Sequence, residues 1–174
     1  MNVVADVLVV YFSRSGITAL LARRLAEKLG ADLDTVRPVK PYAGWVGFIG
    51  GVWQSLSRRA PAVECEYTPS SYALVIIGSP VWAGRLSAPM RSYLTRFGKE
   101  VDTCAAFWVS GGGADYIGLS DEIQQLTGRA PIATASFTEF EVVMGATAMK
   151  LGTMVRAIRN RRGAASVEGR GRAS

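Results

Sequence analysis

A group of hydroxyl-bearing residues directly after the first apolar segment has the composition of a phosphate-binding loop. Its residues are Ser13, Arg14, Ser15, Gly16, Ile17 and Thr18. They stand between an expected buried strand and an expected amphipathic helix, and the first N–H groups of a helix are unpaired and carry partial positive charge. The hydroxyls can donate hydrogen bonds to an anion, and Gly16 lets the backbone approach it. Helix capping alone would need one such residue, so three hydroxyls favour a phosphate group.

Two further loops contain residues suited to a flat ligand. The second loop contains Pro80, Val81, Trp82, Ala83 and Gly84, and the third contains Ser110, Gly111, Gly112 and Gly113. An indole ring between proline and glycine residues can stack on or edge against an aromatic molecule, although the same tryptophan could instead close the end of a sheet as a core residue. The glycines of the third loop bring bare backbone towards a ligand, or form only a flexible connection.

The three loops together predict a ligand with a phosphate at one end and a planar ring at the other, and flavin mononucleotide (FMN) is such a molecule. The chain has no Gly-x-x-x-x-Gly-Lys-Ser/Thr string, and no Gly-x-Gly-x-x-Gly turn follows its first apolar segment. ATP and a dinucleotide bound in the Rossmann manner are therefore disfavoured. The sequence also lacks histidine, which excludes Ser-His-Asp and Cys-His catalysis and histidine metal sites. We expect no catalytic side chain, because a bound flavin supplies the redox chemistry.

The elements that position these loops follow from the apolar pattern. Continuous apolar runs, typical of strands covered on both faces, occupy residues 7–12, 73–77 and 104–109. Two more polar strands, suited to sheet edges, are expected at residues 31–36 and 132–141. Helical spacing predicts helices over residues 17–29, 87–97, 121–126 and 146–158.

This alternation predicts an α/β fold, with a doubly wound, five-stranded parallel sheet between two helix layers. The strand order 2-1-3-4-5 places the three apolar strands in the centre and the two polar strands at the edges. Ligands of such sheets bind in the crevice outside the carboxyl ends of the strands, where the winding direction reverses. The loops that begin at Ser13, Pro80 and Ser110 all lie at that edge.

Two stretches resemble the flavodoxin-like, FMN-binding flavoproteins, most closely the short bacterial flavodoxin-family proteins. These stretches are residues 11–18 and 72–84, in this order and at this spacing, with residues 110–113 as a weaker third. The resemblance extends from residue 7 to about residue 158. It implies a flavodoxin-like three-layer fold with FMN bound non-covalently. It also implies that residues 13–18 hold the phosphate and that residues 80–84 and 110–113 contact the ring.

Three features outside the loops allow several interpretations. Arg85 could place a cation beside the flavin ring, or it could be a solvated arginine at a helix start. Residues 38–70 contain aromatic and aliphatic residues at helical spacing, which could pack on the sheet, form a homodimer contact or lid, or touch a membrane surface. Cys104 is expected in the core, and the acidic neighbours of Cys65 disfavour a reactive thiolate.

The net charge of +6 is concentrated near the end of the 174-residue sequence. Six arginines and one glutamate give residues 156–174 a charge of +5. We expect one FMN-binding domain over residues 1–160 and a disordered basic tail over residues 161–174, and we expect no nucleic-acid or membrane contact by this tail. We find no signal peptide or membrane span in the sequence, and its two cysteines are expected to be unpaired. Both observations lead us to expect a cytoplasmic protein.

Three functions are compatible with these observations. The first is an FMN-dependent oxidoreductase that passes electrons from NAD(P)H or a redox partner to a small acceptor such as a quinone. The second is a one-electron carrier that docks to protein partners. Its ferredoxin-replacing examples have an acidic surface, which this chain lacks. The third is a non-catalytic binding module that uses its basic tail, for which binding would depend strongly on salt.

Overall fold

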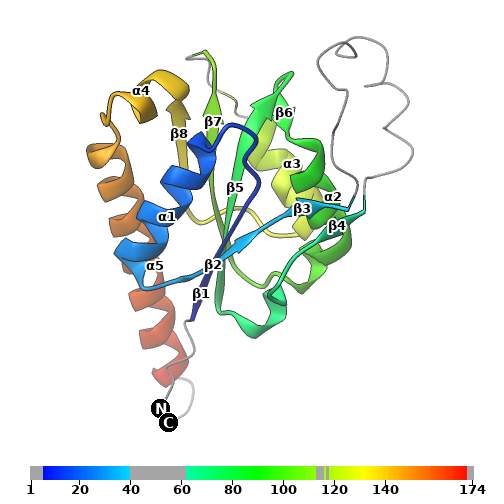
Figure 1. The fold of residues 1–174 in the computed structure, drawn as a ribbon. Coiled ribbons are helices and arrows are strands. Elements are labelled where there is room, and N and C mark those ends of the chain that lie inside the picture. The colour runs from blue at the N-terminus through cyan, green and yellow to red at the C-terminus, as the bar shows by residue number, and fades with distance from the viewer. Residues whose placement is uncertain (1–5, 40–61, 113–115, 117, 172–174) are drawn as a thin grey trace.

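A parallel β-sheet between two layers of helices forms the body of the protein (Figure 1). The computed structural model describes residues 6–39, 62–112, 116 and 118–171, with residues 162–171 as backbone only. The central segment predicted to form a helix, the third glycine of the last loop (Gly113) and the end of the basic tail lie outside the described residues. No helix in the described ranges is both long and apolar enough to cross a membrane.

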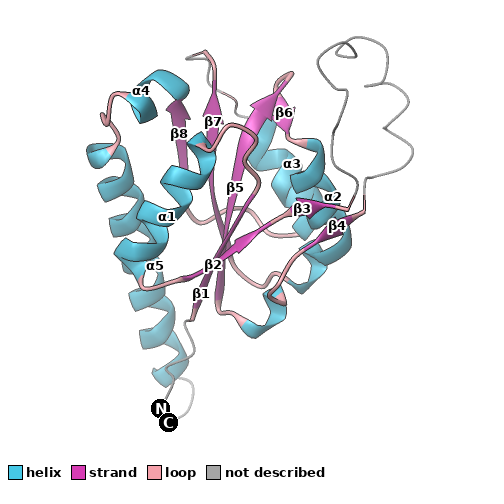
Figure 2. Cartoon of the chain, in the orientation of Figure 1, coloured by secondary structure: helices cyan, strands magenta, loops and turns pink. Residues whose placement is uncertain are grey.

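The sheet has the predicted strand order. Its five parallel strands are β1 (Val7–Tyr11), β2 (Asp32–Thr35), β5 (Leu74–Trp82), β7 (Cys104–Ser110) and β8 (Thr134–Thr138). They are arranged β2-β1-β5-β7-β8, which is the order 2-1-3-4-5 when only these five are counted. The continuous apolar runs form the three central strands because every residue of a strand covered on both faces must be apolar. Figure 2 shows the helices on either side of this sheet.

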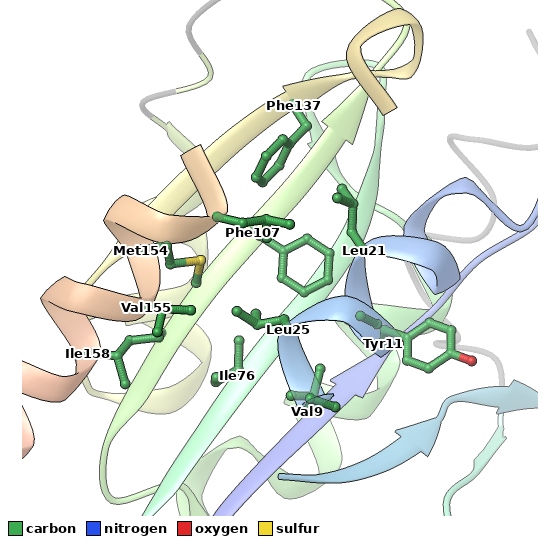
Figure 3. Packing of buried hydrophobic residues seen from close by; sticks show 14 of the residues in the cluster. Val9, Tyr11, Leu21, Leu25, Ile76, Phe107, Phe137, Met154, Val155 and Ile158 are labelled. Atoms are coloured by element: carbon green, nitrogen blue, oxygen red, sulfur yellow. The ribbon is translucent and has the colours of Figure 1, made fainter. Parts of the chain in front are cut away.

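One face of the sheet is covered by α1 (Ile17–Leu29) and α5 (Ala148–Gly171). Leu21 and Leu25 of α1 pack beside Val9, Ile76 and Phe107, as Figure 3 shows. Met154, Val155 and Ile158 bring α5 against the same core. Helix α1 has its predicted bounds because Gly16 and Gly30, both in the left-handed conformation, flank it.

The opposite face is covered by α2 (Ala88–Phe97) and α3 (Gly118–Thr127). Their buried residues Met90, Tyr93 and Ile123 pack with the alternate residues of β1, β5 and β7. Both helices were expected, but α3 begins and ends slightly outside the predicted range of 121–126. The two helix faces therefore enclose two apolar layers, one on each side of the sheet.

Several elements differ from the sequence prediction. Strand β5 continues past residue 77 to Trp82 and turns back through β6 (Arg85–Leu86). The polar strand predicted over 132–141 ends at Thr138, because Thr138 and Glu141 form a capping box that begins the short helix α4 (Glu139–Val143). Helix α5 continues past residue 158 to Gly171, into the tail expected to be disordered over residues 161–174, through a stretch with four helix-favouring arginines but also three glycines.

A second, small sheet that was not predicted from the sequence follows β2. Strands β3 (Arg37–Pro38) and β4 (Val63–Glu64) form a small antiparallel sheet. Asp34 is buried, and its Oδ2 accepts hydrogen bonds from the backbone N–H groups of Glu66 (2.8 Å) and Tyr67 (2.9 Å). Asp32 accepts a hydrogen bond from the hydroxyl of Tyr72 (2.8 Å). The acidic residues of this strand thus hold neighbouring backbone and side-chain donors.

Both cysteines are free thiols in the structure. Cys104 is fully buried in β7, as predicted, and burial raises the pKa of its thiol from 9.0 to about 11. Cys65 is partly buried, and its pKa is also raised, first by burial and then by the nearby carboxylate of Asp34. A thiol with a raised pKa is a poor nucleophile near neutral pH, as predicted for Cys65, but the cause is burial and Asp34 rather than its acidic neighbours in the sequence.

The Cys104 thiol should make stability fall in alkaline solution. Its contribution is fully present below pH 9.0 and is lost as the pH rises towards 11, because the unfolded thiol ionises first. Urea unfolding should show that wild type loses about 2 kcal/mol more than Cys104→Ala across this window. Equal losses in the two proteins would contradict the prediction. Tyrosine ionisation at high pH is common to both and cancels in the comparison.

Candidate functional site

The first loop joins the carboxyl end of β1 to α1 and leaves the positively polarised start of this helix exposed. Ser13 Oγ accepts a hydrogen bond from the backbone N–H of Gly16 at 3.1 Å, which closes the loop. Gly16 is the N-cap residue of α1 with a φ of +87°, and nothing lies within 4 Å of the position that a Cβ would take there. The loop therefore leaves open space beside the first N–H groups of α1, as an anion-binding cradle requires.

The charges around this helix start favour an anion. The first turn of α1 contains no acidic residue, and Arg14 and Ser15 are exposed. Among the residues that the structure describes, Arg14 forms no ion pair, so its guanidinium is available to a ligand. Ile17 is partly buried, while Thr18 is only 2% exposed, so its predicted contact with a phosphate has little surface to use. The helix dipole adds partial positive charge at the same point.

The second loop is a tight β-hairpin. Val81 and Trp82 of β5 pair with Leu86 and Arg85 of β6 in antiparallel register, which leaves Ala83 and Gly84 as a two-residue turn. Both turn residues have positive φ, +49° and +77°, as the favoured two-residue hairpin turns require. Within the described ranges, Ala83 is the only residue other than glycine with a positive φ. The hairpin holds its exposed tip at the carboxyl edge of the sheet.

Trp82 connects the second loop to the first. Its ring lies edge-on to Phe12, with ring centroids 5.7 Å apart and an angle of 87° between the planes. Phe12 directly precedes Ser13, and its backbone N–H donates to the carbonyl of Gly78 at 3.1 Å. Trp82 is partly exposed rather than sealed in the core, so part of the indole surface remains for a ligand. The structure therefore brings the indole ring of the second loop close to the first loop.

The third loop follows β7 at the same edge. Pro80 of β5 is in register with Val109 of β7, so this loop is the neighbour of the second one. Ser110 is buried, and its hydroxyl donates a hydrogen bond to the carbonyl of Gly112. Gly111 and Gly112 are exposed, with nothing within 4 Å of a Cβ at either position. The described part of the loop thus offers uncovered backbone, while Gly113 lies outside the described residues.

The side chains and backbone of the three loops fit FMN. An acid-free helix start with an open glycine suits a doubly charged phosphate. A partly exposed indole and bare glycine backbone suit a flat ring. The indole N–H of Trp108, two residues before Ser110, is buried and has no hydrogen-bond acceptor in the described part of the chain, which leaves a donor near the third loop.

Several supporting residues could not be recognised from the sequence. Ser79 is fully buried, and its hydroxyl accepts from the N–H of Ser87 at 3.0 Å and lies 3.0 Å from the Ser87 hydroxyl. Glu122 of α3 holds the second strand of the hairpin and pairs with Arg85, so the charge of this arginine already has a partner. Among these supporting residues, only Phe12 could have been suspected from the sequence, because it directly precedes the first loop. The contacts between α3 and the hairpin join residues that are distant in the sequence, so no local pattern predicts them.

The fold and its three loops define a doubly wound α/β protein with an open, acid-free helix start and a partly exposed indole ring at one edge of the sheet. A family model described as flavodoxin matches residues 6–134. The chain belongs to the flavodoxin family. This match agrees with the resemblance of the first two loops. A search of curated proteins finds no match.

Solved structures show the same fold at low sequence identity. A flavoprotein in complex with FMN from Lactobacillus acidophilus NCFM is 20% identical, with a TM-score of 0.65, over 80% of this chain and 97% of that one. The Trp repressor binding protein from Bacillus subtilis is 12% identical, with a TM-score of 0.56, over 87% and 98%. The two-electron reduced flavodoxin from Megasphaera elsdenii is 19% identical, with a TM-score of 0.54, over 87% and 96%.

Proposed function

We propose that the chain binds FMN at the carboxyl edge of its sheet and serves as an FMN-dependent oxidoreductase. The observation that carries this proposal is the contact between Phe12 and Trp82, which joins the open helix start at Gly16 to an exposed aromatic surface. One ligand can therefore occupy both loops. The flavodoxin family match and the FMN in the L. acidophilus flavoprotein support the choice of flavin over other phosphorylated rings.

Each loop has a separate task in this proposal. The backbone N–H groups after Gly16, with Arg14 and the hydroxyls of Ser13 and Ser15, hold the phosphate. Trp82 and the Ala83–Gly84 turn flank the ring, and the backbone of residues 110–112 faces it from the neighbouring strand. When bound, FMN supplies the exchange of electrons with a donor and an acceptor. The side chains bind and orient it, which agrees with a chain that has no histidine.

The proposed electron route runs from NAD(P)H or a redox partner to a small acceptor such as a quinone. Electron transport to a protein partner is the second candidate, and one observation favours it. Phe140, Val143, Met144 and Met149 are large apolar residues that are 64–81% exposed. They lie on α4, on its C-cap residue Met144 and on the start of α5, after the carboxyl end of β8 and at the same edge as the proposed flavin site. Exposed apolar clusters of this kind often mark protein contacts.

The remaining expectations stay predictions. They are a homodimer, a cytoplasmic location and a domain boundary near residue 160. The structure gives Arg85 a carboxylate partner, so we do not propose it as the cation beside the ring. We also do not propose nucleic-acid or membrane binding by the basic tail.

A binding titration tests the proposed function directly. Purified protein stripped of small molecules should quench FMN fluorescence in a saturable way, with riboflavin binding more weakly because it lacks the phosphate. The loaded protein is then mixed with NAD(P)H and a quinone. Turnover supports the oxidoreductase, whereas flavin that takes up its electrons in two separate steps without NAD(P)H turnover supports the carrier. A protein that binds neither FMN nor riboflavin would refute both.

A further inference from the structure

We propose that Glu122 is a positioning residue for the flavin-binding hairpin. It fixes the second loop from the neighbouring helix α3, so that the ring-binding surface exists before the ligand arrives. This inference rests on the proposed binding of FMN. Preformed binding surfaces hold ligands more tightly because less ordering is needed on binding.

The contact between Glu122 and the hairpin is direct. Glu122 Oε2 accepts a hydrogen bond from the backbone N–H of Leu86 at 2.9 Å. Leu86 is in β6, which forms the outer strand of the hairpin, and its side chain is 1% exposed. An N–H bound to a carboxylate is a charge-assisted hydrogen bond, which is stronger than a bond between neutral groups. A side chain of helix α3 therefore holds the backbone of the outer strand β6.

Two arginines lie beside the same carboxylate and compensate its charge, although its buried Oε1 accepts no hydrogen bond from the described residues. Glu122 Oε1 lies 3.0 Å from Nε of Arg91 on α2 and 3.4 Å from Nη2 of Arg85 on β6. The side chain of Glu122 is only 11% exposed, against 33% for Arg91 and 52% for Arg85. A carboxylate this buried requires compensation for its charge, which the arginines supply. The group joins α2, α3 and β6 at one point.

The second strand of the hairpin is fixed at its base as well. Ser87 donates its backbone N–H to Ser79 Oγ at 3.0 Å, which ties the start of α2 to β5. Leu86 pairs with Val81, and Arg85 pairs with Trp82. Only Ala83 and Gly84 remain beyond these contacts. The position of the Trp82 backbone thus depends on both Glu122 and the Ser79–Ser87 contact.

The expected effect is a loss of affinity for the ring and not for the phosphate. Glu122→Ala removes the acceptor of the Leu86 N–H and leaves two arginines without a carboxylate, so the hairpin becomes mobile. We expect FMN and riboflavin affinities to fall together, by about 30-fold. Glu122→Gln keeps an oxygen that can accept from Leu86, so we expect a loss of about threefold. Asp121→Asn is the matched control, because it removes an exposed acid from the same helix and should change neither affinity.

The experiment combines binding titrations with amide hydrogen exchange on the protein without flavin. Glu122→Ala should speed exchange of the Leu86 amide at least tenfold. The Val75 amide, in the centre of the sheet, should be unchanged and thus shows that the variant is folded. Unchanged Leu86 exchange, or affinities equal to wild type, would overturn the inference. Exchange that rises equally at Val75 would show a general loss of stability and would also overturn it.

The outcome is separable from that of the proposed function. If wild type binds FMN and Glu122→Ala binds it equally well, only the positioning role fails. If wild type binds neither FMN nor riboflavin, both proposals fail. A fall in FMN affinity without a fall in riboflavin affinity would assign Glu122 to the phosphate end, and would contradict the role proposed here.

Discussion

Replacing Gly16 with valine should weaken FMN binding about 100-fold and leave riboflavin binding within about threefold of wild type. Gly16 has a φ of +87°, which a β-branched residue rarely adopts, so the loop must change shape. The new side chain also enters the space that is open beside the first N–H groups of α1. Both effects act on the phosphate, because riboflavin differs from FMN only in lacking that group.

The control for this change is at the other end of the same helix. Gly30, the C-cap residue of α1, has a φ of +62° and equally open surroundings. Gly30→Val should therefore introduce a similar strain, of roughly 1–2 kcal/mol, far from the proposed phosphate site. Fluorescence titrations with both ligands distinguish the cases. If Gly30→Val weakens FMN binding as much as Gly16→Val does, the loss reflects stability, and the phosphate assignment is wrong.

Replacing Gly78 with alanine should destabilise the protein by about 3 kcal/mol and lower its melting temperature by roughly 6–12 °C. Gly78 lies in the central strand β5, between Tyr11 on β1 and Phe107 on β7. An added Cβ would approach Cζ of Phe107 to 2.4 Å and Cβ of Tyr11 to 3.0 Å. Both neighbours are buried in a close-packed layer, so neither has space to move away.

A second substitution checks the cause of this loss. Phe107→Leu shortens the ring that meets the new methyl group, so the double variant should be at least 1 kcal/mol more stable than the sum of the two single changes predicts. Gly152→Ala, on α5 with open surroundings, is the matched control. It should raise stability by up to about 1 kcal/mol, because alanine favours a helix. Urea unfolding measures all four variants. Additive changes would show that the contact with Phe107 is not the cause.

Gly78 also connects the core to the proposed site. Its carbonyl accepts the N–H of Phe12, the residue that carries the first loop and contacts Trp82. Phe107, packed over Gly78, and Tyr11 belong to the layer beneath α1. The close packing at this glycine therefore helps to fix the register between β1 and β5, the strands that lead into the first and second loops.

The central strands and the first helix were determined largely by local sequence. A strand buried on both faces must be apolar at every position, so the runs in β1, β5 and β7 were recognisable without any knowledge of their neighbours. Helix α1 was predicted with its observed bounds because glycines mark both ends. The composition of the first loop was equally visible, since hydroxyls and glycine at a helix start are the local features that predict phosphate binding.

The hairpin and the charged contacts around it were decided by tertiary structure. The Gly78-Ser79-Pro80 sequence suggested the end of a strand, but β5 continues because Ser79 bonds to Ser87 and Pro80 remains in register with Val109. Glu122 and Leu86 are far apart in sequence, and no spacing rule connects them. Likewise, Asp34 predicted a solvent-facing edge strand, but in the structure the segment at Glu66 and Tyr67 covers this residue. Local patterns report how much of a residue is buried, whereas the choice of partner depends on which distant segments the fold brings together.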